Sequence, residues 1–76
     1  MSLTKTVTAN LHVLRLAKGL TQQELAGRAK ITVSYVSMLE RGHRSPPLET
    51  VEALAKALKV PPLQLLKSAH APSARR

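Results

Sequence analysis

The sequence predicts an all-α fold of five short helices, and three observations support this. Aliphatic side chains recur every three or four residues along most of the chain, the period of a helix with one buried face. Threonines that can cap helices precede two of these segments, and prolines and glycines separate the others. A length of 76 residues suits one small domain and leaves no room for a second.

The first helix is expected over residues 6–18, after a short arm at residues 1–5. Its inner face carries three aliphatic residues: Val7, Leu11 and Leu14. Gly19 follows the last periodic residue and is expected to end the helix.

The second and third helices are expected over residues 22–29 and 33–41. Thr21 and Glu24 have the spacing of a capping box, in which each side chain bonds the backbone amide of the other. Thr32 is a natural N-cap for the third helix. Between the two helices, Lys30 falls where the turn needs a left-handed residue. A tight helix-turn-helix unit is therefore predicted.

The fourth helix is expected over residues 48–58, after a loop at residues 42–47 that two prolines stiffen. Pro61 and Pro62 allow a short fifth helix that ends at Lys67, because the first turn of a helix tolerates proline. Residues 68–76 (SAHAPSARR) have too little apolar surface to fold and are expected to form a flexible basic tail. The predicted domain therefore spans residues 1–67.

The core must be aliphatic, because Tyr35 is the only aromatic residue. The expected core residues are Leu11, Leu14, Leu20, Leu25, Ile31, Val36, Leu39, Leu48, Val51, Leu54 and Leu58. Leu63 and Leu66 either complete this core or belong to a surface that binds a second protomer. A core this small makes self-association plausible.

The third helix has an unusual outer face. If Val36 and Leu39 are buried, the helix period turns four uncharged residues outward: Val33, Ser34, Ser37 and Met38. Such a face is expected of a helix that contacts base edges in the major groove of DNA. The alternative is a helical hairpin that only contributes to a core.

The charge of the chain favours a polyanionic partner. Twelve Lys and Arg residues against four acidic residues give a formal net charge of +8. Arg28, Lys30, Arg41 and Arg44 bracket the third helix, which favours phosphate binding over the alternative of a solvated basic surface. Lys56, Lys59 and Lys67 are expected to face solvent.

Other classes of function are disfavoured by the residues that the chain lacks. There is no cysteine or aspartate, and the three histidines are far apart in the sequence, so neither a catalytic triad nor a zinc site is expected. We therefore expect no enzymatic activity, cofactor or metal. Charged residues interrupt every apolar stretch, which argues against a signal peptide, a membrane span and membrane binding, and favours a cytoplasmic protein.

Four motifs together resemble the Xre/Cro-like helix-turn-helix family of bacterial and phage transcriptional regulators. They are GLTQQELA at residues 19–26, SYVSMLERG at residues 34–42, the proline that follows, and LETVEALAKAL at residues 48–58. The resemblance covers residues 11–60 and implies a compact, five-helix, lambda-repressor-like DNA-binding domain. The chain departs from the family at Lys30 and Lys59, where glycine is usual, and at Pro47, where a capping serine is common. We expect the turn geometry to survive, because a cation at a helix C-terminus is favourable.

The resemblance also implies the roles of individual residues. Val33, Ser34, Ser37 and Met38 would read base edges. The phosphate backbone would be contacted by six residues: Gln22, Thr32, Tyr35, Arg41, His43 and Arg44. Arg15 and Glu40 would form a structural ion pair beneath the DNA-facing surface, the alternative being that Glu40 is an ordinary surface acid. Val33 and Met38 cannot form bidentate hydrogen bonds, so part of the specificity is expected from DNA shape.

The expected function is a sequence-specific regulator of transcription, in particular a repressor that binds a palindromic operator as a homodimer. Such an operator presents two half-sites about 34 Å apart, and one domain offers a single reading helix. The dimer interface is expected on the fourth and fifth helices, with Leu65 as the best candidate. One alternative is an antitoxin-like protein that binds DNA and holds a partner protein through its apolar C-terminal region. Another is a basic amphipathic protein of the membrane surface, which the short capped helices disfavour.

Overall fold

The computed structural model describes residues 3–67, and these residues fold into five helices without a strand. The helices are α1 (Leu3–Ala17), α2 (Gln22–Ala29), α3 (Val33–Glu40), α4 (Leu48–Leu58) and α5 (Pro62–Leu66). The predicted all-α, five-helix fold is thus confirmed. The predicted basic tail at 68–76 lies outside the described residues.

The expectation of an N-terminal arm that extends to Lys5 was wrong, because α1 already begins at Leu3. The extra turn is held to the rest of the domain by contacts remote in sequence. Thr4 Oγ1 lies 3.0 Å from Ser45 Oγ, and Leu3 lines an apolar groove with Leu48 and Leu66. These contacts stabilise a turn for which the local sequence carries no start signal.

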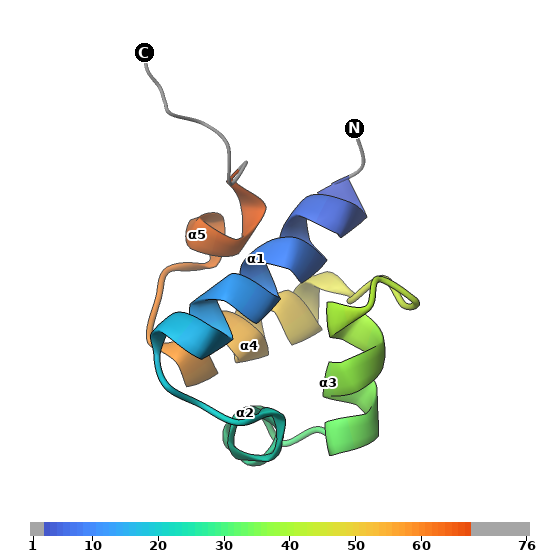
Figure 1. Cartoon of the computed structure of the whole chain (residues 1–76). Helices are drawn as coiled ribbons and strands as arrows, with labels where there is room; N and C mark the ends of the chain where they lie inside the picture. Colours follow the sequence, from blue (N-terminus) through green and yellow to red (C-terminus); the bar gives the residue numbers. More distant parts are fainter. Residues whose placement is uncertain (1–2, 68–76) are drawn as a thin grey trace.

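The helices pack around one core, with α2 and α3 at one end of the domain (Figure 1). α1 crosses the domain and contacts α3, α4 and α5, while α2 packs against α3 and α4. The N-terminal end of α1 and helix α5 lie at the end of the domain opposite α2. This arrangement leaves the outer side of α3 uncovered by the other helices.

The core is aliphatic, as predicted. Its fully buried large side chains are Leu11, Leu25, Leu39, Leu54, Leu58, Leu65 and Val36. Leu14 and Ile31 pack against this core but are only half-buried. The small side chains of Ala26, Ala29, Ala55 and Ala57 complete it and allow the helices to approach closely.

Two leucines, Leu48 and Leu65, lie elsewhere than predicted, and Leu63 takes the second of its two expected places, the surface. Leu48 is 67% exposed and Leu63 is 60% exposed, so neither belongs to the core. Leu65 is fully buried and cannot be the surface contact of a dimer, so that prediction was wrong. The reason is the orientation of α5, which turns Leu65 towards the core and Leu63 away from it.

Asn10 holds α5 in this orientation. Its amide nitrogen donates to the carbonyl oxygens of Leu65, at 2.9 Å, and of Lys67, at 2.5 Å. Both carbonyls lie at the C-terminal end of α5, where a helix has no internal donors left. The sequence analysis missed this role, because a polar residue inside a helix gives no sign of a partner more than fifty positions away.

The helix ends have the predicted caps. Thr21 Oγ1 accepts from the amide of Glu24 at 3.0 Å, and Glu24 Oε1 accepts from the amide of Thr21 at 2.8 Å, which completes the capping box. Lys30, with φ of 61°, and Lys59, with φ of 59°, both adopt the left-handed conformation. The turn geometry therefore survives the replacement of glycine by lysine.

Candidate nucleic-acid interface

Buried and capping contacts fix the orientation of α3. Thr32 Oγ1 accepts from the amide of Tyr35 at 3.1 Å, which defines the first turn. Val36 and Leu39 are fully buried, so the opposite side of the helix faces outward. Val33 is 46% exposed and Ser34 is exposed, while Ser37 and Met38 are half-buried. The start of α3 thus presents uncharged side chains to solvent, as the sequence predicted.

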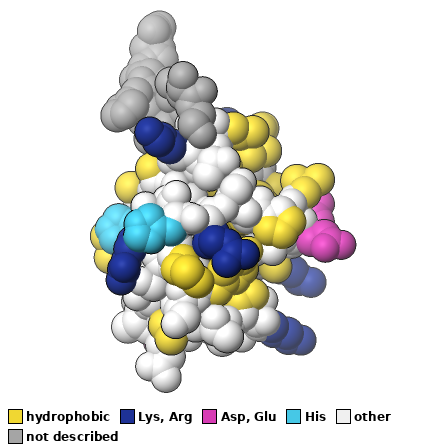
Figure 2. All heavy atoms as spheres, turned by 90° about the vertical axis from the view of Figure 1, so that its right-hand side faces the viewer, with side chains coloured by type: hydrophobic (Ala, Val, Ile, Leu, Met, Phe, Trp, Pro, Cys, Tyr) yellow, Lys and Arg dark blue, Asp and Glu magenta, His cyan; other side chains and the backbone are white. Residues whose placement is uncertain are grey.

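Basic side chains follow this face at the C-terminal end of α3. Arg41, His43 and Arg44 are all exposed. The Arg44 guanidinium carbon lies 5.9 Å from the centre of the Tyr35 ring, a distance at which a cation and an aromatic face attract each other. Figure 2 views this side of the molecule and shows basic and histidine side chains among hydrophobic ones, with acidic side chains only at the right-hand edge.

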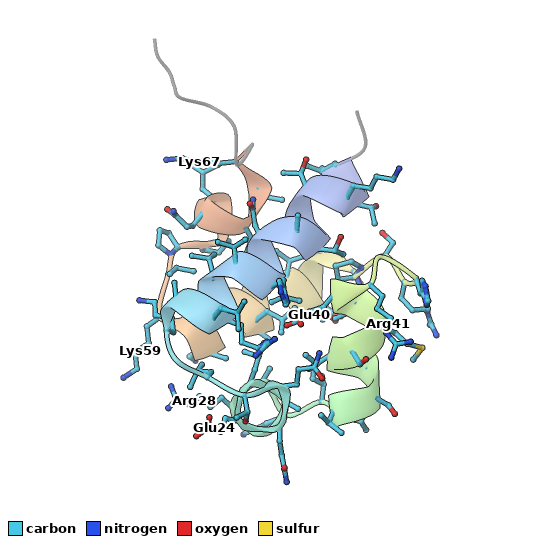
Figure 3. All side chains as sticks on the ribbon, viewed as in Figure 1. Glu24, Arg28, Glu40, Arg41, Lys59 and Lys67 are labelled. Carbon is cyan, nitrogen blue, oxygen red and sulfur yellow. The ribbon has the colours of Figure 1, made fainter. Side chains whose placement is uncertain are left out.

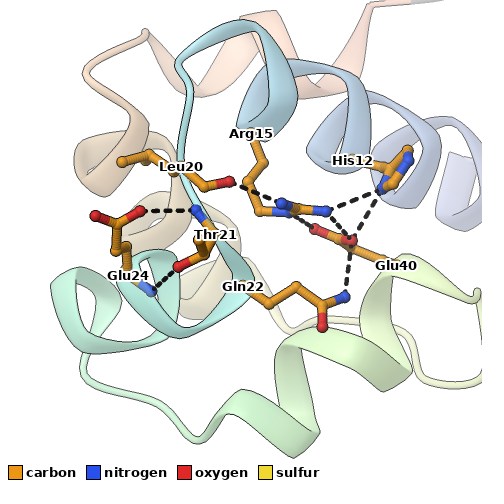
Figure 4. Close-up of polar contacts among 7 residues, drawn as sticks. All are labelled: His12, Arg15, Leu20, Thr21, Gln22, Glu24 and Glu40. Atoms are coloured by element: carbon orange, nitrogen blue, oxygen red, sulfur yellow. Dashed lines mark hydrogen bonds and ion pairs between the residues drawn. The ribbon is translucent and has the colours of Figure 1, made fainter.

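Glu40 joins three helices beneath this face (Figure 4). Arg15, on α1, donates from Nε to Glu40 Oε2 at 2.6 Å and from Nη2 to Oε1 at 3.1 Å. The Glu40 side chain is only 5% exposed and that of Arg15 10% exposed. Arg15 Nη1 also donates to the carbonyl of Leu20, in the connection between α1 and α2, at 2.7 Å. The structure therefore contains the ion pair that the family resemblance implied.

His12 also contacts Glu40, a role that the sequence analysis missed. Its Nδ1 lies 2.9 Å from Glu40 Oε1, and because a carboxylate only accepts, Nδ1 must carry the proton and donate. Arg15 Nη2 lies 3.5 Å from the same Nδ1. Since a protonated Nδ1 cannot also accept, we interpret this longer contact as the approach of two donors. The spacing of His12 and Arg15, three residues apart on one helix face, is the only sequence signal for this role.

The environment of Glu40 favours its ionised form. Burial raises the pKa of the Glu40 carboxyl group, whereas hydrogen bonds from Arg15, His12 and Gln22 lower it. The hydrogen bonds outweigh the burial, so the pKa lies below its ordinary value of 4.5. The carboxylate is therefore charged in the folded protein at neutral pH and accepts from three side chains at once.

Gln22 lies at the first position of α2, where free amides and the helix dipole favour a phosphate. Its side chain is half-buried and donates from Nε2 to Glu40 Oε1 at 3.1 Å. The Glu40 contacts thus fix the positions of both helices of the helix-turn-helix unit relative to α1. The predicted contact between Gln22 and a phosphate remains a prediction.

The predicted site residues do not all lie on one surface. The start of α3 and the basic residues after it share the side seen in Figure 2. Arg28, which the sequence analysis placed beside α3, lies instead on the side of the domain opposite Arg41 (Figure 3). Within residues 3–67 no group of three potential ligands could hold a metal ion. None of the helices in this range combines the length and apolar character needed to cross a membrane.

Comparison with known proteins gives a consistent family relationship. Residues 11–65 match the family model described as Helix-turn-helix. The chain is 42% identical over 66 residues to the uncharacterized HTH-type transcriptional regulator y4dJ of Sinorhizobium fredii, covering 87% of this chain and 86% of that protein. It is 38% identical to the immunity repressor protein of Bacillus phage phi105, covering 72% of this chain but only 38% of the repressor.

A solved structure agrees with these matches. The crystal structure of the hypothetical transcription factor NHTF from Neisseria superimposes with a TM-score of 0.85 at 34% sequence identity. The aligned region covers 90% of this chain and 78% of that one. The arrangement of helices found here is therefore that of a transcription-factor fold.

Proposed function

The chain belongs to the Xre/Cro-like helix-turn-helix family, and we propose that it is a sequence-specific regulator of transcription that binds double-stranded DNA. The observation that carries this proposal is the exposed, uncharged face at the start of α3, with Arg41 and Arg44 beyond its C-terminal end. A helix with these features can enter the major groove while the cations hold the phosphates. The proposed ligand implies action in the cytoplasm, where bacterial DNA lies.

We assign the base-reading role to the exposed side of α3: Val33, Ser34, Ser37 and Met38. Val33 and Met38 would contact thymine methyl groups, and the serines would form single hydrogen bonds. The phosphate contacts are assigned to Gln22, Thr32, Tyr35, Arg41, His43 and Arg44. Because the four base-reading residues include no side chain that forms bidentate hydrogen bonds with bases, DNA shape would supply part of the specificity.

We propose that the chain acts as a repressor, by occupying an operator that polymerase needs. Its similarity to a phage immunity repressor supports this direction of regulation. Because the chain spans only 38% of that repressor, the comparison supports the DNA-binding part alone. An activator could use the same DNA contacts. The proposal of repression, and not activation, therefore rests on the similarity to the phage repressor.

A palindromic operator requires two protomers, and the structure offers a surface for a homodimer. An apolar groove of about 160 Å³ lies where the N-terminal ends of α1 and α4 meet α5. Leu3, 63% exposed, and Leu48, 67% exposed, line it together with Pro46 and Leu66. A second protomer that bound in this groove would bury the two exposed leucines. We therefore move the proposed interface from Leu65 to this groove.

The homodimer is tested by Leu48→Glu, with Leu16→Glu as the control. Leu16 is 56% exposed and lies on α1 about 20 Å from Leu3, at a rise of about 1.5 Å per residue. Leu48→Glu should shift the protein to monomers in sedimentation equilibrium, while Leu16→Glu should sediment like the unchanged protein. If the unchanged protein is a monomer at tens of micromolar, dimerisation without DNA is excluded.

Selection of random duplex DNA by the purified protein tests the function itself. We expect the selected duplexes to contain an inverted repeat whose half-sites are about one helical turn, roughly 10 base pairs, apart. Selection of a single half-site would agree with sequence-specific DNA binding but would contradict the proposed homodimer. Selection of no common sequence, despite binding at low ionic strength, would contradict sequence-specific regulation.

A further inference from the structure

A second basic surface lies between the C-terminal ends of α2 and α4. It is a groove of about 600 Å³ lined by four cationic side chains, Arg28, Lys30, Lys56 and Lys59. The remaining lining residues are alanines, of which Ala29 and Ala57 are only 8% exposed. We call this surface the basic groove. It combines an apolar floor with a cationic rim.

Among the cations of the basic groove, Arg28 has an electrostatic attraction to one acid, Glu24 on α2. All four are exposed, and none forms an ion pair within residues 3–67. The nearest acid along α2, Glu24, lies one turn before Arg28, but its carboxylate accepts from the amide of Thr21 in the capping box. Four like charges around one groove repel each other, and an anionic ligand would relieve this repulsion.

The backbone of the groove is also strained. Lys30 and Lys59 are the only non-glycine residues between positions 3 and 67 with a positive φ, and both line the basic groove. Glycine adopts this conformation without the steric cost that a lysine side chain brings. Both positions are C-caps, of α2 and of α4, and both place a cation at the same groove.

Two cations of the basic groove, Arg28 and Lys59, lie on the other side of the domain from Arg41. Figure 3 shows Arg28 and Lys59 on the left-hand side of the domain and Arg41 on the right. A duplex held by α3 and Arg41 would therefore not reach Lys59. The part of the groove around Lys59 would then stay available to a second ligand while DNA is bound.

We propose that the basic groove binds an acidic segment of a partner protein. Carboxylates of this segment would pair with the four cations, and an apolar side chain between them would lie on the alanines of the floor. A second nucleic acid fits less well, because a phosphate backbone has no apolar group for that floor. The proposal does not depend on the DNA-binding role of α3, so each can fail without the other.

The test compares two double variants that each remove two positive charges. Lys56→Gln with Lys59→Gly changes only the α4 side of the basic groove, and the glycine suits the left-handed position. Arg41→Gln with Arg44→Gln changes the α3 side. The probe is a fluorescein-labelled hexapeptide of alternating glutamate and leucine, and its binding is measured by fluorescence anisotropy at low ionic strength. DNA binding of each variant is measured with a duplex in the same buffer.

We expect the groove variant to bind the peptide roughly 3- to 30-fold more weakly, as the loss of two exposed ion pairs allows. It should bind the duplex as the unchanged protein does. The variant with Arg41→Gln and Arg44→Gln should bind the duplex more weakly and the peptide as the unchanged protein does. A peptide in which serine replaces leucine should also bind more weakly, because it cannot use the alanine floor.

Three results would overturn the proposal. The peptide fails to bind the unchanged protein, both double variants weaken peptide binding equally, or the groove variant loses DNA affinity instead. Equal weakening in both variants would mean that the overall charge of the protein attracts the peptide. A loss of DNA affinity in the groove variant would mean that nucleic acid occupies the groove. Circular dichroism of both variants verifies that they are folded. Failure of the unchanged protein to bind any duplex would contradict the proposed function and leave this inference standing.

Discussion

At the scale of single residues, Glu40 connects three helices of the domain. Its carboxylate accepts from Arg15 and His12 on α1 and from Gln22 on α2, while its own backbone ends α3. One side chain therefore sets how the two helices of the helix-turn-helix unit lie against α1. A change at Glu40 should affect both stability and the positions of the DNA contacts.

Removal of the Glu40 carboxylate should destabilise the protein strongly. Glu40→Ala leaves the Arg15 guanidinium, which is 10% exposed, without its charged partner, at a cost of about 3 kcal/mol. For a domain of this size, that corresponds to a fall in melting temperature of more than about 10 °C. The exposed Glu52 supplies the control, since Glu52→Ala should change stability by less than about 0.5 kcal/mol. Equal losses in thermal unfolding would show that the ion pair contributes nothing specific.

The lowered pKa of Glu40 also predicts how stability depends on pH. The folded protein binds the Glu40 proton less readily than the unfolded chain does, so the carboxylate stabilises the fold above pH 4.5. This contribution is lost as the pH falls below 4.5 and through the lowered pKa. In urea unfolding at pH 7 and at pH 3, the difference in stability between the unchanged protein and Glu40→Gln should shrink at the lower pH. A difference that stays constant would show that the pKa of Glu40 is the same in both states.

At the scale of the helices, contacts at the helix ends define each element. The capping box begins α2, Thr32 begins α3, and left-handed lysines end α2 and α4. The two lysines introduce a steric cost, which their favourable interaction with the helix dipole offsets in part. These short-range contacts thus set where the helices begin and end, and they can be tested one at a time.

The left-handed conformation of Lys59 predicts an unusual order of stability. Lys59→Gly and Lys59→Ala remove the same charge, but only glycine relieves the strain, so the glycine variant should be more stable by about 1 kcal/mol. At Lys56, inside α4, the order should reverse, because glycine costs about 1 kcal/mol relative to alanine in a helix. Chemical denaturation of the four variants measures both differences. The same order at both positions would contradict a left-handed Lys59.

The exposed face of α3 predicts two kinds of DNA-binding variant. Val33→Ala or Ser34→Ala should change which operator is preferred, because these residues are expected at base edges. Arg44→Ala should weaken binding to all sequences alike and reduce the salt slope by about one counterion. Footprinting on a set of variant operators separates the two effects. An unchanged preference in both α3 variants would mean that these side chains do not read bases.

At the scale of the whole molecule, the sequence predicted those features whose signals are local. The caps at Thr21 and Thr32 and the buried side of α3 follow from residues within one or two turns. Leu65 could not be placed, because the rotation of α5 depends on Asn10, far away in the sequence. The basic groove was missed for the same reason, since it forms only when the ends of α2 and α4 meet.

The proposed function requires that the exposed side of α3 contacts DNA. An NMR titration of the isotope-labelled protein with duplex DNA at low ionic strength tests it most directly, because each backbone amide reports separately. We expect the largest shift changes at residues 32–38 and 41–44 and at the start of α2. No complex, or shift changes confined to α4 and α5 with α3 unaffected, would contradict the claim.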